Sequence, residues 1–166
     1  MTEDRTSNFS KPDEKSHQQA MDAAVRILTH RDHSKYELKQ KLRQRGFENR
    51  DIDAVIAECK RLDYINDRRT ARIYILQLKR KCFGKRYIQM ALKKKRLGGT
   101  AIEKILPENY PDADERENAG KLLDKKRKAF EREPDDKKRK NKMYRFLYSR
   151  GFGKEVIAEL IRDFVK

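Results

Sequence analysis

The sequence predicts an all-α fold of three tandem three-helix, helix-turn-helix-like repeats in an elongated, curved array. The first observation is a turn signal, Gly46-Phe47, with apolar residues at helical spacing on both sides. The second is that this pattern recurs 50 residues later, around Arg96-Leu97, and 55 residues after that, around Gly151-Phe152. The third is that β-branched residues never alternate with polar ones over a useful length, so we expect no strand.

The same five apolar marks occur in each copy of the pattern. They are Leu38, Leu42, Ile52, Val55 and Ile56, then Ile88, Leu92, Ile102, Ile105 and Leu106, then Met143, Leu147, Ile157, Leu160 and Ile161. A unit of this size cannot bury its apolar face alone, so we expect neighbouring units to stack. The expected division is a flexible N-terminal tail (1–18) followed by repeats at 19–66, 67–112 and 113–166.

In the first repeat we expect a helix from about Gln19 to Thr29, because small and branched apolar residues form one stripe there. Ser34 and Glu37 have the spacing of a capping box, which predicts the start of the second helix. Gly46 is typical of a left-handed helix terminator. The third helix is expected from about Arg50 to Leu62.

The second repeat is expected to begin with a helix from Asp67 to about Lys81, which Gly84 separates from a helix over 85–96. Thr100 and Glu103 predict another capping box ahead of the third helix. Two prolines, Pro107 and Pro111, are expected to end this repeat.

The third repeat is expected to open with a helix from about Asp114 to Glu131. Pro134 and the lysine-rich segment 137–140 should then connect it to the last pair of helices.

Charge is high and unevenly distributed: charged residues make up 42% of the chain, and the net charge is +16. Residues 1–66 carry 13 basic and 12 acidic groups, residues 67–112 carry 13 and 4, and residues 113–166 carry 17 and 11. The second and third repeats therefore hold nearly all of the positive charge. This favours a polyanionic partner, with nucleic acid first.

Two features bear on where the protein works. Its two cysteines, Cys59 and Cys82, lack C-x-x-C spacing, which suits a reducing compartment. No apolar run is long enough to span a bilayer. We expect a cytoplasmic protein with no membrane partner.

The sequence contains no pattern that indicates catalysis. His30 and His33 are three residues apart but have no third or fourth ligand nearby, so we expect no metal site. Nucleophile elbows, P-loops and paired carboxylates on one helix face are also missing. We expect no cofactor and no enzymatic activity.

Two basic runs are the candidate site for nucleic-acid binding. Lys79 to Arg96 contains nine basic residues and no acid, and Lys137 to Arg145 contains six and none. Within these runs the hypothesis assigns binding to Lys79, Arg80, Lys81, Lys85, Arg86, Lys93, Lys94, Lys137, Lys138, Arg139 and Lys140. Interleaved aromatics would suit single-stranded nucleic acid, whose bases stack on rings.

The aromatic residues in these runs allow two interpretations. Phe83 and Tyr87 could stack on bases or belong to the core, and the same choice holds for Tyr144 and Tyr148. A cation also precedes each turn, at Arg45, Lys95 and Arg150. We favour a helix-stabilising role for these three over a periodic phosphate ladder.

The first repeat and its boundary carry motifs that resemble the bacterial RecX regulatory proteins, and the resemblance extends from about residue 19 to the C-terminus. The motifs are Arg31-Asp32-His33-Ser34, Glu37-Leu38, Lys41-Leu42, Gly46-Phe47 and Tyr64-Ile65-Asn66-Asp67, with Arg69 and Ala71. Thr70 stands where the family usually has an aromatic residue, and Arg96 where it often has glycine.

The resemblance implies tandem three-helix modules and a non-catalytic modulator of the RecA recombinase. Such proteins bind the RecA filament on single-stranded DNA and inhibit ATP hydrolysis, strand exchange or filament extension, in homologous recombination, DNA repair and the SOS response. We therefore expect the RecA nucleoprotein filament and single-stranded DNA as partners, weaker binding to double-stranded DNA, and a monomer.

The alternative function is a helix-turn-helix-type DNA-binding protein, general or sequence-specific. The third helices of the first and third repeats are poorly suited to a DNA groove because they carry acidic residues. These are Asp51, Asp53 and Glu58, and Glu155, Glu159 and Asp163.

Overall fold

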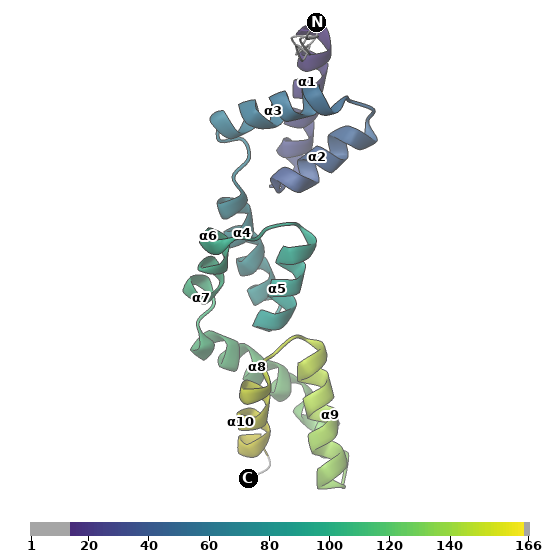
Figure 1. Cartoon of the computed structure of the whole chain (residues 1–166). Helices are drawn as coiled ribbons and strands as arrows, with labels where there is room; N and C mark the ends of the chain where they lie inside the picture. Colours follow the sequence, from purple (N-terminus) through teal and green to yellow (C-terminus); the bar gives the residue numbers. More distant parts are fainter. Residues whose placement is uncertain (1–13, 165–166) are drawn as a thin grey trace, which may run out of the picture. The chain divides into compact units, whose positions relative to one another are not determined.

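The computed structural model describes residues 14–164, and every regular element in that range is an α-helix (Figure 1). The all-α prediction is confirmed for this part of the chain. The chain divides between Asn66 and Asp67 into two compact units, called here unit 1 and unit 2. That division coincides with the predicted start of the second repeat.

Unit 1 contains α1 (Glu14–His30), α2 (Lys35–Gln44) and α3 (Asn49–Arg61), and α1 contacts both other helices. Its core includes Ala20 and Ala24 of α1, where small side chains allow close approach. The first helix begins before Gln19, so residues 14–18, which we assigned to the tail, are helical. The rest of the predicted tail, residues 1–13, lies outside the described residues.

The predicted capping box at the start of α2 is confirmed. The Ser34 hydroxyl accepts a hydrogen bond from the Glu37 amide at 3.1 Å, and the Glu37 carboxylate accepts one from the Ser34 amide at 3.0 Å. Both bonds satisfy amides that the helix itself leaves without partners. At the other end of α2, Gly46 adopts the expected left-handed conformation with φ +84°.

Unit 2 contains the other two repeats in one compact body. Its helices are α4 (Asp67–Arg80), α5 (Lys85–Lys94), α6 (Thr100–Glu103), α7 (Ile105–Asn109), α8 (Asp112–Glu131), α9 (Asp136–Ser149) and α10 (Lys154–Phe164). Two hydrophobic clusters form within it, one from α4 to α7 and one from α8 to α10. The division into three repeats stays a prediction; each of the three hydrophobic clusters draws its residues from one of the proposed repeats.

The apolar marks read from the sequence fill the three cores. All of them are buried except Leu160, which is partly buried. Arg96, at the turn position that Gly46 and Gly151 occupy, also takes a left-handed conformation, with φ +55°. An L-residue in that conformation costs about 1 kcal/mol.

The predicted capping box at Thr100 is wrong. The N-cap of α6 is Gly99, which has φ +99° and no side chain to cap the helix. The expected third helix is also divided into α6 and α7. Pro107 lies inside α7 and has no amide to donate to the Glu103 carbonyl, so a continuous helix through Lys104 would lose that bond.

The lysine-rich segment 137–140 is not a connection, as we had expected, but part of α9. Asp135 caps this helix, accepting a hydrogen bond from the Lys138 amide at 3.0 Å. The cap and the acidic Asp136 in the first turn favour a helix start here and offset the lysine charges that follow. The connection is therefore restricted to the short segment around Pro134.

The second and third repeats meet through their backbones. The Gly84 amide donates to the Arg150 carbonyl at 2.9 Å, and the Arg86 amide donates to the Gly151 carbonyl at 3.0 Å. A Cβ added at Gly84 would lie 2.3 Å from the Gly151 carbonyl oxygen, so only glycine permits this approach. The N-terminal end of α5 is thereby fixed against the C-terminal end of α9 (Figure 1).

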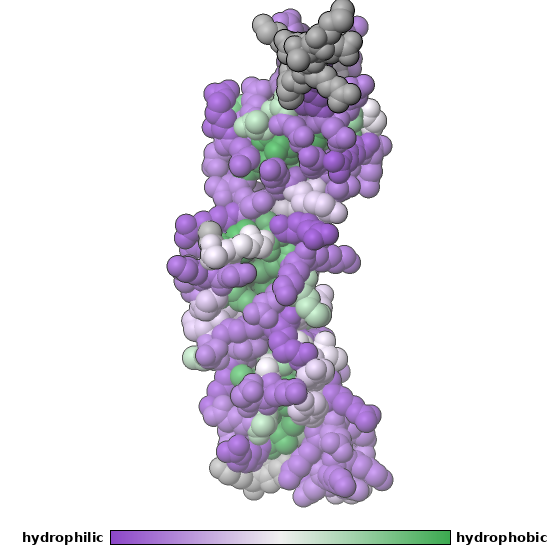
Figure 2. Space-filling view, viewed as in Figure 1, coloured by the Kyte–Doolittle hydropathy of each residue, from purple (hydrophilic) through white to green (hydrophobic). Residues whose placement is uncertain are grey.

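Hydrophilic side chains cover most of the visible face of both units, with hydrophobic residues showing between them (Figure 2). In the described range, no helix has the length and apolar character needed to cross a bilayer.

Candidate nucleic-acid interface

Three of the predicted binding cations are already engaged in contacts that stabilise the fold. Lys79 forms an ion pair with Asp114 and donates to the Asn109 carbonyl at 3.2 Å. Lys85 pairs with Asp112, and Arg139 with Asp136. These three are also partly buried, so they are less available to an external anion.

The other eight predicted cations are exposed: Arg80, Lys81, Arg86, Lys93, Lys94, Lys137, Lys138 and Lys140. Seven of these, all except Arg86, have side chains that make no ion pair, hydrogen bond or ring contact with any described residue, whereas the Arg86 guanidinium lies over an aromatic ring. They lie on α4, α5 and α9 of unit 2, or directly after α4. These cations remain available for phosphate groups.

Phe83 and Tyr87 pack on the core of the second repeat, which supports the structural interpretation of this aromatic pair. Their rings stack with centroids 4.0 Å apart and planes 11° from parallel. The Arg150 guanidinium lies 5.4 Å from the Phe83 centroid, and Tyr87 lies against Gly151. Both rings therefore help to join the second and third repeats.

Of the cations that precede the turns, Lys95 and Arg150 also lie over aromatic rings. Lys95 Nζ is 4.9 Å from the centroid of Tyr74, and Arg150 is 6.0 Å from that of Phe146, in addition to its contact with Phe83. Each is the C-cap residue of its helix. These contacts support our preference for a structural role over a phosphate ladder.

Tyr144 and Tyr148 form a different arrangement, nearer the surface. Their rings stack with centroids 5.6 Å apart, and Tyr148 is 39% exposed. The Arg86 guanidinium lies 4.1 Å from the Tyr148 centroid. The sequence predicted Arg86 as part of the site, and it allowed both a base-stacking and a core role for the two tyrosines. Their i, i+4 spacing was a signal for the pair, but no local pattern indicates the contact with Arg86.

A buried carboxylate supports the helix that carries Arg86. Glu115 of α8 is 4% exposed, and its carboxylate accepts a hydrogen bond from the Lys85 amide at 2.8 Å. Burial raises the pKa of Glu115, although the bond from Lys85 acts in the other direction. At the surface, Lys85 lowers the pKa of Asp112. These contacts fix the first turn of α5 from two sides.

The acidic residues of the two possible recognition helices are mostly occupied. Asp51 is only 4% exposed and accepts a hydrogen bond from the Ser16 hydroxyl. On α10, Arg116 of α8 pairs with both Glu159 and Asp163. The ion pairs remove part of the negative charge but leave no cationic face on these helices for a duplex groove.

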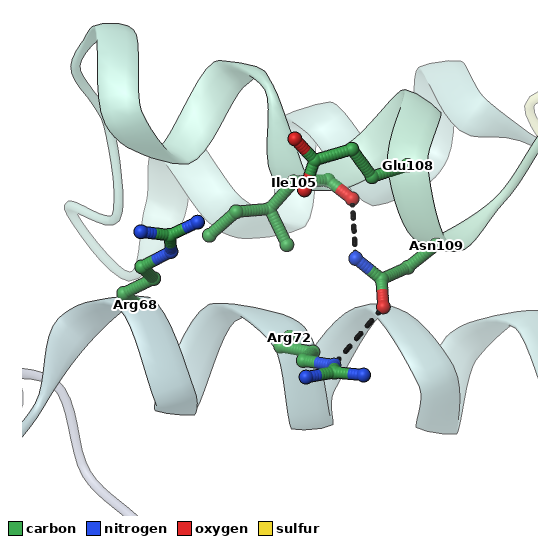
Figure 3. Close-up of a pocket in the computed structure, with 5 residues that line it drawn as sticks. All are labelled: Arg68, Arg72, Ile105, Glu108 and Asn109. Atoms are coloured by element: carbon green, nitrogen blue, oxygen red, sulfur yellow. Dashed lines mark hydrogen bonds between the residues drawn. The ribbon is translucent and has the colours of Figure 1, made fainter.

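A polar pocket of about 240 Å³ lies between α4 and α7 in unit 2 (Figure 3). Arg72 Nε donates to the Asn109 side-chain oxygen at 3.1 Å, and the Asn109 amide group donates to the Ile105 carbonyl at 2.8 Å. Arg68 and Glu108 complete the lining. Sequence reasoning missed this pocket, although Arg68 and Arg72 have i, i+4 spacing. Its main polar groups bind one another.

The two histidines that were considered as metal ligands, His30 and His33, lie in different surroundings. His33 is 4% exposed, with its Nδ1 atom 2.8 Å from the Arg31 carbonyl oxygen, and burial lowers its pKa. His30 lies in the last turn of α1. Over residues 14–164, no group of three or more histidine, cysteine, aspartate or glutamate side chains is arranged to hold a metal ion.

Comparison with protein families gives two matches. Residues 20–59 match the family model described as the first three-helix domain of RecX, and residues 113–161 match that of its third three-helix domain. Each match falls within one of the repeats expected from the sequence.

Individual relatives match most of the chain. The regulatory protein RecX of Vibrio parahaemolyticus is 36% identical over 137 residues, which cover 82% of this chain and 86% of that protein. The regulatory protein RecX of Legionella pneumophila is 33% identical over 146 residues, covering 87% and 93%.

Solved structures share the fold. The crystal structure of RecX from Lactobacillus salivarius aligns with a TM-score of 0.82 at 22% identity, covering 91% of this chain and 97% of that one. A second crystal structure, of a regulatory protein RecX, aligns with a TM-score of 0.78 at 21% identity, covering 93% and 79%.

Proposed function

This chain belongs to the RecX family of regulatory proteins, and on that premise we propose that it binds the RecA filament on single-stranded DNA and inhibits RecA. In this proposal it regulates homologous recombination and DNA repair as a cytoplasmic monomer, without a reaction of its own. Family membership is the observation that carries the proposal.

The charge distribution supports binding to a nucleoprotein filament. Eight exposed cations lie on or beside α4, α5 and α9, and seven of them have side chains that pair with no described residue. Counterions released when such cations meet phosphates favour association. Two repeats in one compact unit also offer several weak contacts at once, which add through effective concentration.

The direct test is the ATP hydrolysis of RecA on single-stranded DNA, with this protein added after the filament has formed. We expect hydrolysis to fall at protein concentrations well below that of RecA. One bound molecule that blocks the growth of a filament would reduce the number of RecA subunits in the whole filament. Unchanged hydrolysis, together with tight binding to naked DNA, would contradict the proposal. The protein would then be a general DNA binder.

The candidate cations are tested by replacing Lys93, Lys94, Lys137 and Lys140 with glutamate. Loss of four phosphate contacts should lower the slope of log affinity against log salt by about 3. The control changes four exposed residues outside the site and so has the same net charge; they are Lys125, Lys126 and Lys128 of α8 and its C-cap residue Arg132. Equal affinities for the two variants would remove these lysines from the interface.

The alternative function, a helix-turn-helix-type DNA-binding protein, predicts a footprint on double-stranded DNA. The acidic residues of α3 and α10 argue against it, because neither helix offers phosphate a cationic face. A discrete footprint on a duplex without RecA would favour this alternative.

A further inference from the structure

We propose that one track across the junction of α9 and α5, exposed except at the partly buried Tyr144, stacks the unpaired bases of a single-stranded nucleic acid. This inference rests on the proposed function and specifies which residues meet the bases. The α9–α5 track consists of Lys140, Tyr144, Tyr148, Arg86, Met90 and Lys94.

Helical spacing produces the two halves of the track. Lys140, Tyr144 and Tyr148 follow one another at intervals of four residues on α9, as Arg86, Met90 and Lys94 do on α5. Residues at this spacing lie on one face of a helix. Each helix therefore contributes one stripe, with cations among aromatic or thioether side chains.

The Arg86–Tyr148 contact joins the two stripes end to end. The Arg86 guanidinium lies 4.1 Å from the centroid of Tyr148, whose ring stacks on that of Tyr144. The Arg86 amide also donates to the Gly151 carbonyl at 3.0 Å, so main chain and side chain are both held at the junction. Arg86 and Tyr148 therefore have little side-chain freedom to lose when a ligand binds.

The exposed groups in the track suit bases better than phosphates alone. Met90 is 64% exposed and Tyr148 is 39% exposed, among cations that would suffice by themselves for a phosphate backbone. Arg86 is exposed, and a guanidinium plane is one of the surfaces on which an unpaired base can stack. Base stacking needs an open π-face, which a duplex hides and a single strand presents.

The test compares two fluorescent oligomers with equal numbers of phosphates, an oligothymidylate and an abasic chain. Electrostatic attraction is the same for both, so any difference in affinity reports contacts to bases. For the unmodified protein we expect the oligothymidylate to bind about tenfold more tightly in a fluorescence anisotropy titration.

Two variants assign that preference to the track. Arg86→Lys keeps the charge but loses the planar group, and Tyr148→Leu keeps an apolar side chain but loses the ring. Both should lower the preference for oligothymidylate to less than twofold, while Arg86→Lys binds the abasic chain as before. Should Tyr148→Leu fail to fold, Arg86→Lys alone decides the outcome.

The controls repeat each change outside the track. Arg162→Lys changes an exposed arginine of α10, and Tyr36→Leu changes a tyrosine that is 40% exposed in unit 1. Both should keep the tenfold preference. Equal binding of the two oligomers to the unmodified protein would overturn the inference, as would a preference that survives in Arg86→Lys.

The RecA assay separates this inference from the proposed function. Equal binding of both oligomers while RecA is still inhibited would reject the track and retain the function. A base preference without inhibition of RecA would reject the function and retain the track. If base preference is absent and Tyr148→Leu weakens inhibition, the track binds protein and the inference is wrong.

Discussion

The turns of unit 1 and unit 2 use glycine in the same conformation for different reasons. Gly46 has φ +84°, and a Cβ added there would meet nothing within 4 Å. Gly151 has φ +85°, but its added Cβ would lie 2.4 Å from Tyr87 Cβ and backbone nitrogen. In unit 1, Gly46 is needed only for the left-handed conformation of its turn. In unit 2, Gly151 also allows the backbones of two repeats to come into contact.

This difference has consequences for function. Unit 1 carries nearly balanced charge, and its three helices complete one core. Unit 2 carries most of the positive charge, and its two cores are joined at the backbones of Gly84 and Gly151. The junction also places Arg86 on Tyr148. The surface across α5 and α9 therefore depends on contacts that are not part of the repeated pattern.

The largest expected effect concerns the glycine contact. Gly151→Ala should destabilise unit 2 by about 3 to 5 kcal/mol, because left-handed strain adds to a clash with Tyr87. Gly46→Ala carries the strain alone and should cost about 1 to 2 kcal/mol. Urea denaturation of both variants measures the difference. Similar losses would mean that Tyr87 moves aside without cost, and the comparison between the turns would fail.

A smaller effect should distinguish the two predicted capping boxes. Ser34→Ala should cost about 1 kcal/mol, because it removes the acceptor for the Glu37 amide. Thr100→Ala should change stability by less than about 0.5 kcal/mol, since Gly99 and not Thr100 is the N-cap. The same denaturation experiment applies. A loss of about 1 kcal/mol for Thr100→Ala would contradict the assigned N-cap.

The smallest effect is an opposite response of the two units to acid between about pH 7 and pH 5. Burial lowers the pKa of His33, so the folded state favours the neutral ring, and unit 1 should lose stability as the pH falls. Burial raises the pKa of Glu115, so the folded state favours the protonated acid, and unit 2 should gain stability as the pH falls toward the ordinary glutamate value of 4.5.

Urea denaturation followed by NMR signals from each unit would measure these responses. His33→Gln should flatten the pH dependence of unit 1, and Glu115→Gln that of unit 2. Parallel responses of both units, unchanged in the two variants, would show that other groups control the pH dependence.

Local signals allowed the helices of unit 1 to be predicted well. Ser34 and Glu37 lie three residues apart, and their capping box involves no other part of the chain. Prediction failed where competing local signals had to be weighed. Thr100 and Glu103 have the same spacing, but Gly99 precedes them and Pro107 interrupts the helix that they would begin.

The candidate site was predicted only in part. Counting cations identified Lys79 and Lys85, but it could not show that Asp114 and Asp112 already pair with them. The partners are about 30 residues away along the chain, and helical periodicity says nothing about contacts at that separation.

The amino-acid sequence by itself determined the helices, their repetition and the uneven charge, because apolar spacing, caps and charge counts act within a few residues of one another. Only the tertiary structure decided which cations stay exposed and which ring Arg86 covers. The Arg86 contact depends on the backbones of Gly84 and Gly151 meeting across the junction, a contact set by packing between the two repeats and by no pattern within either of them.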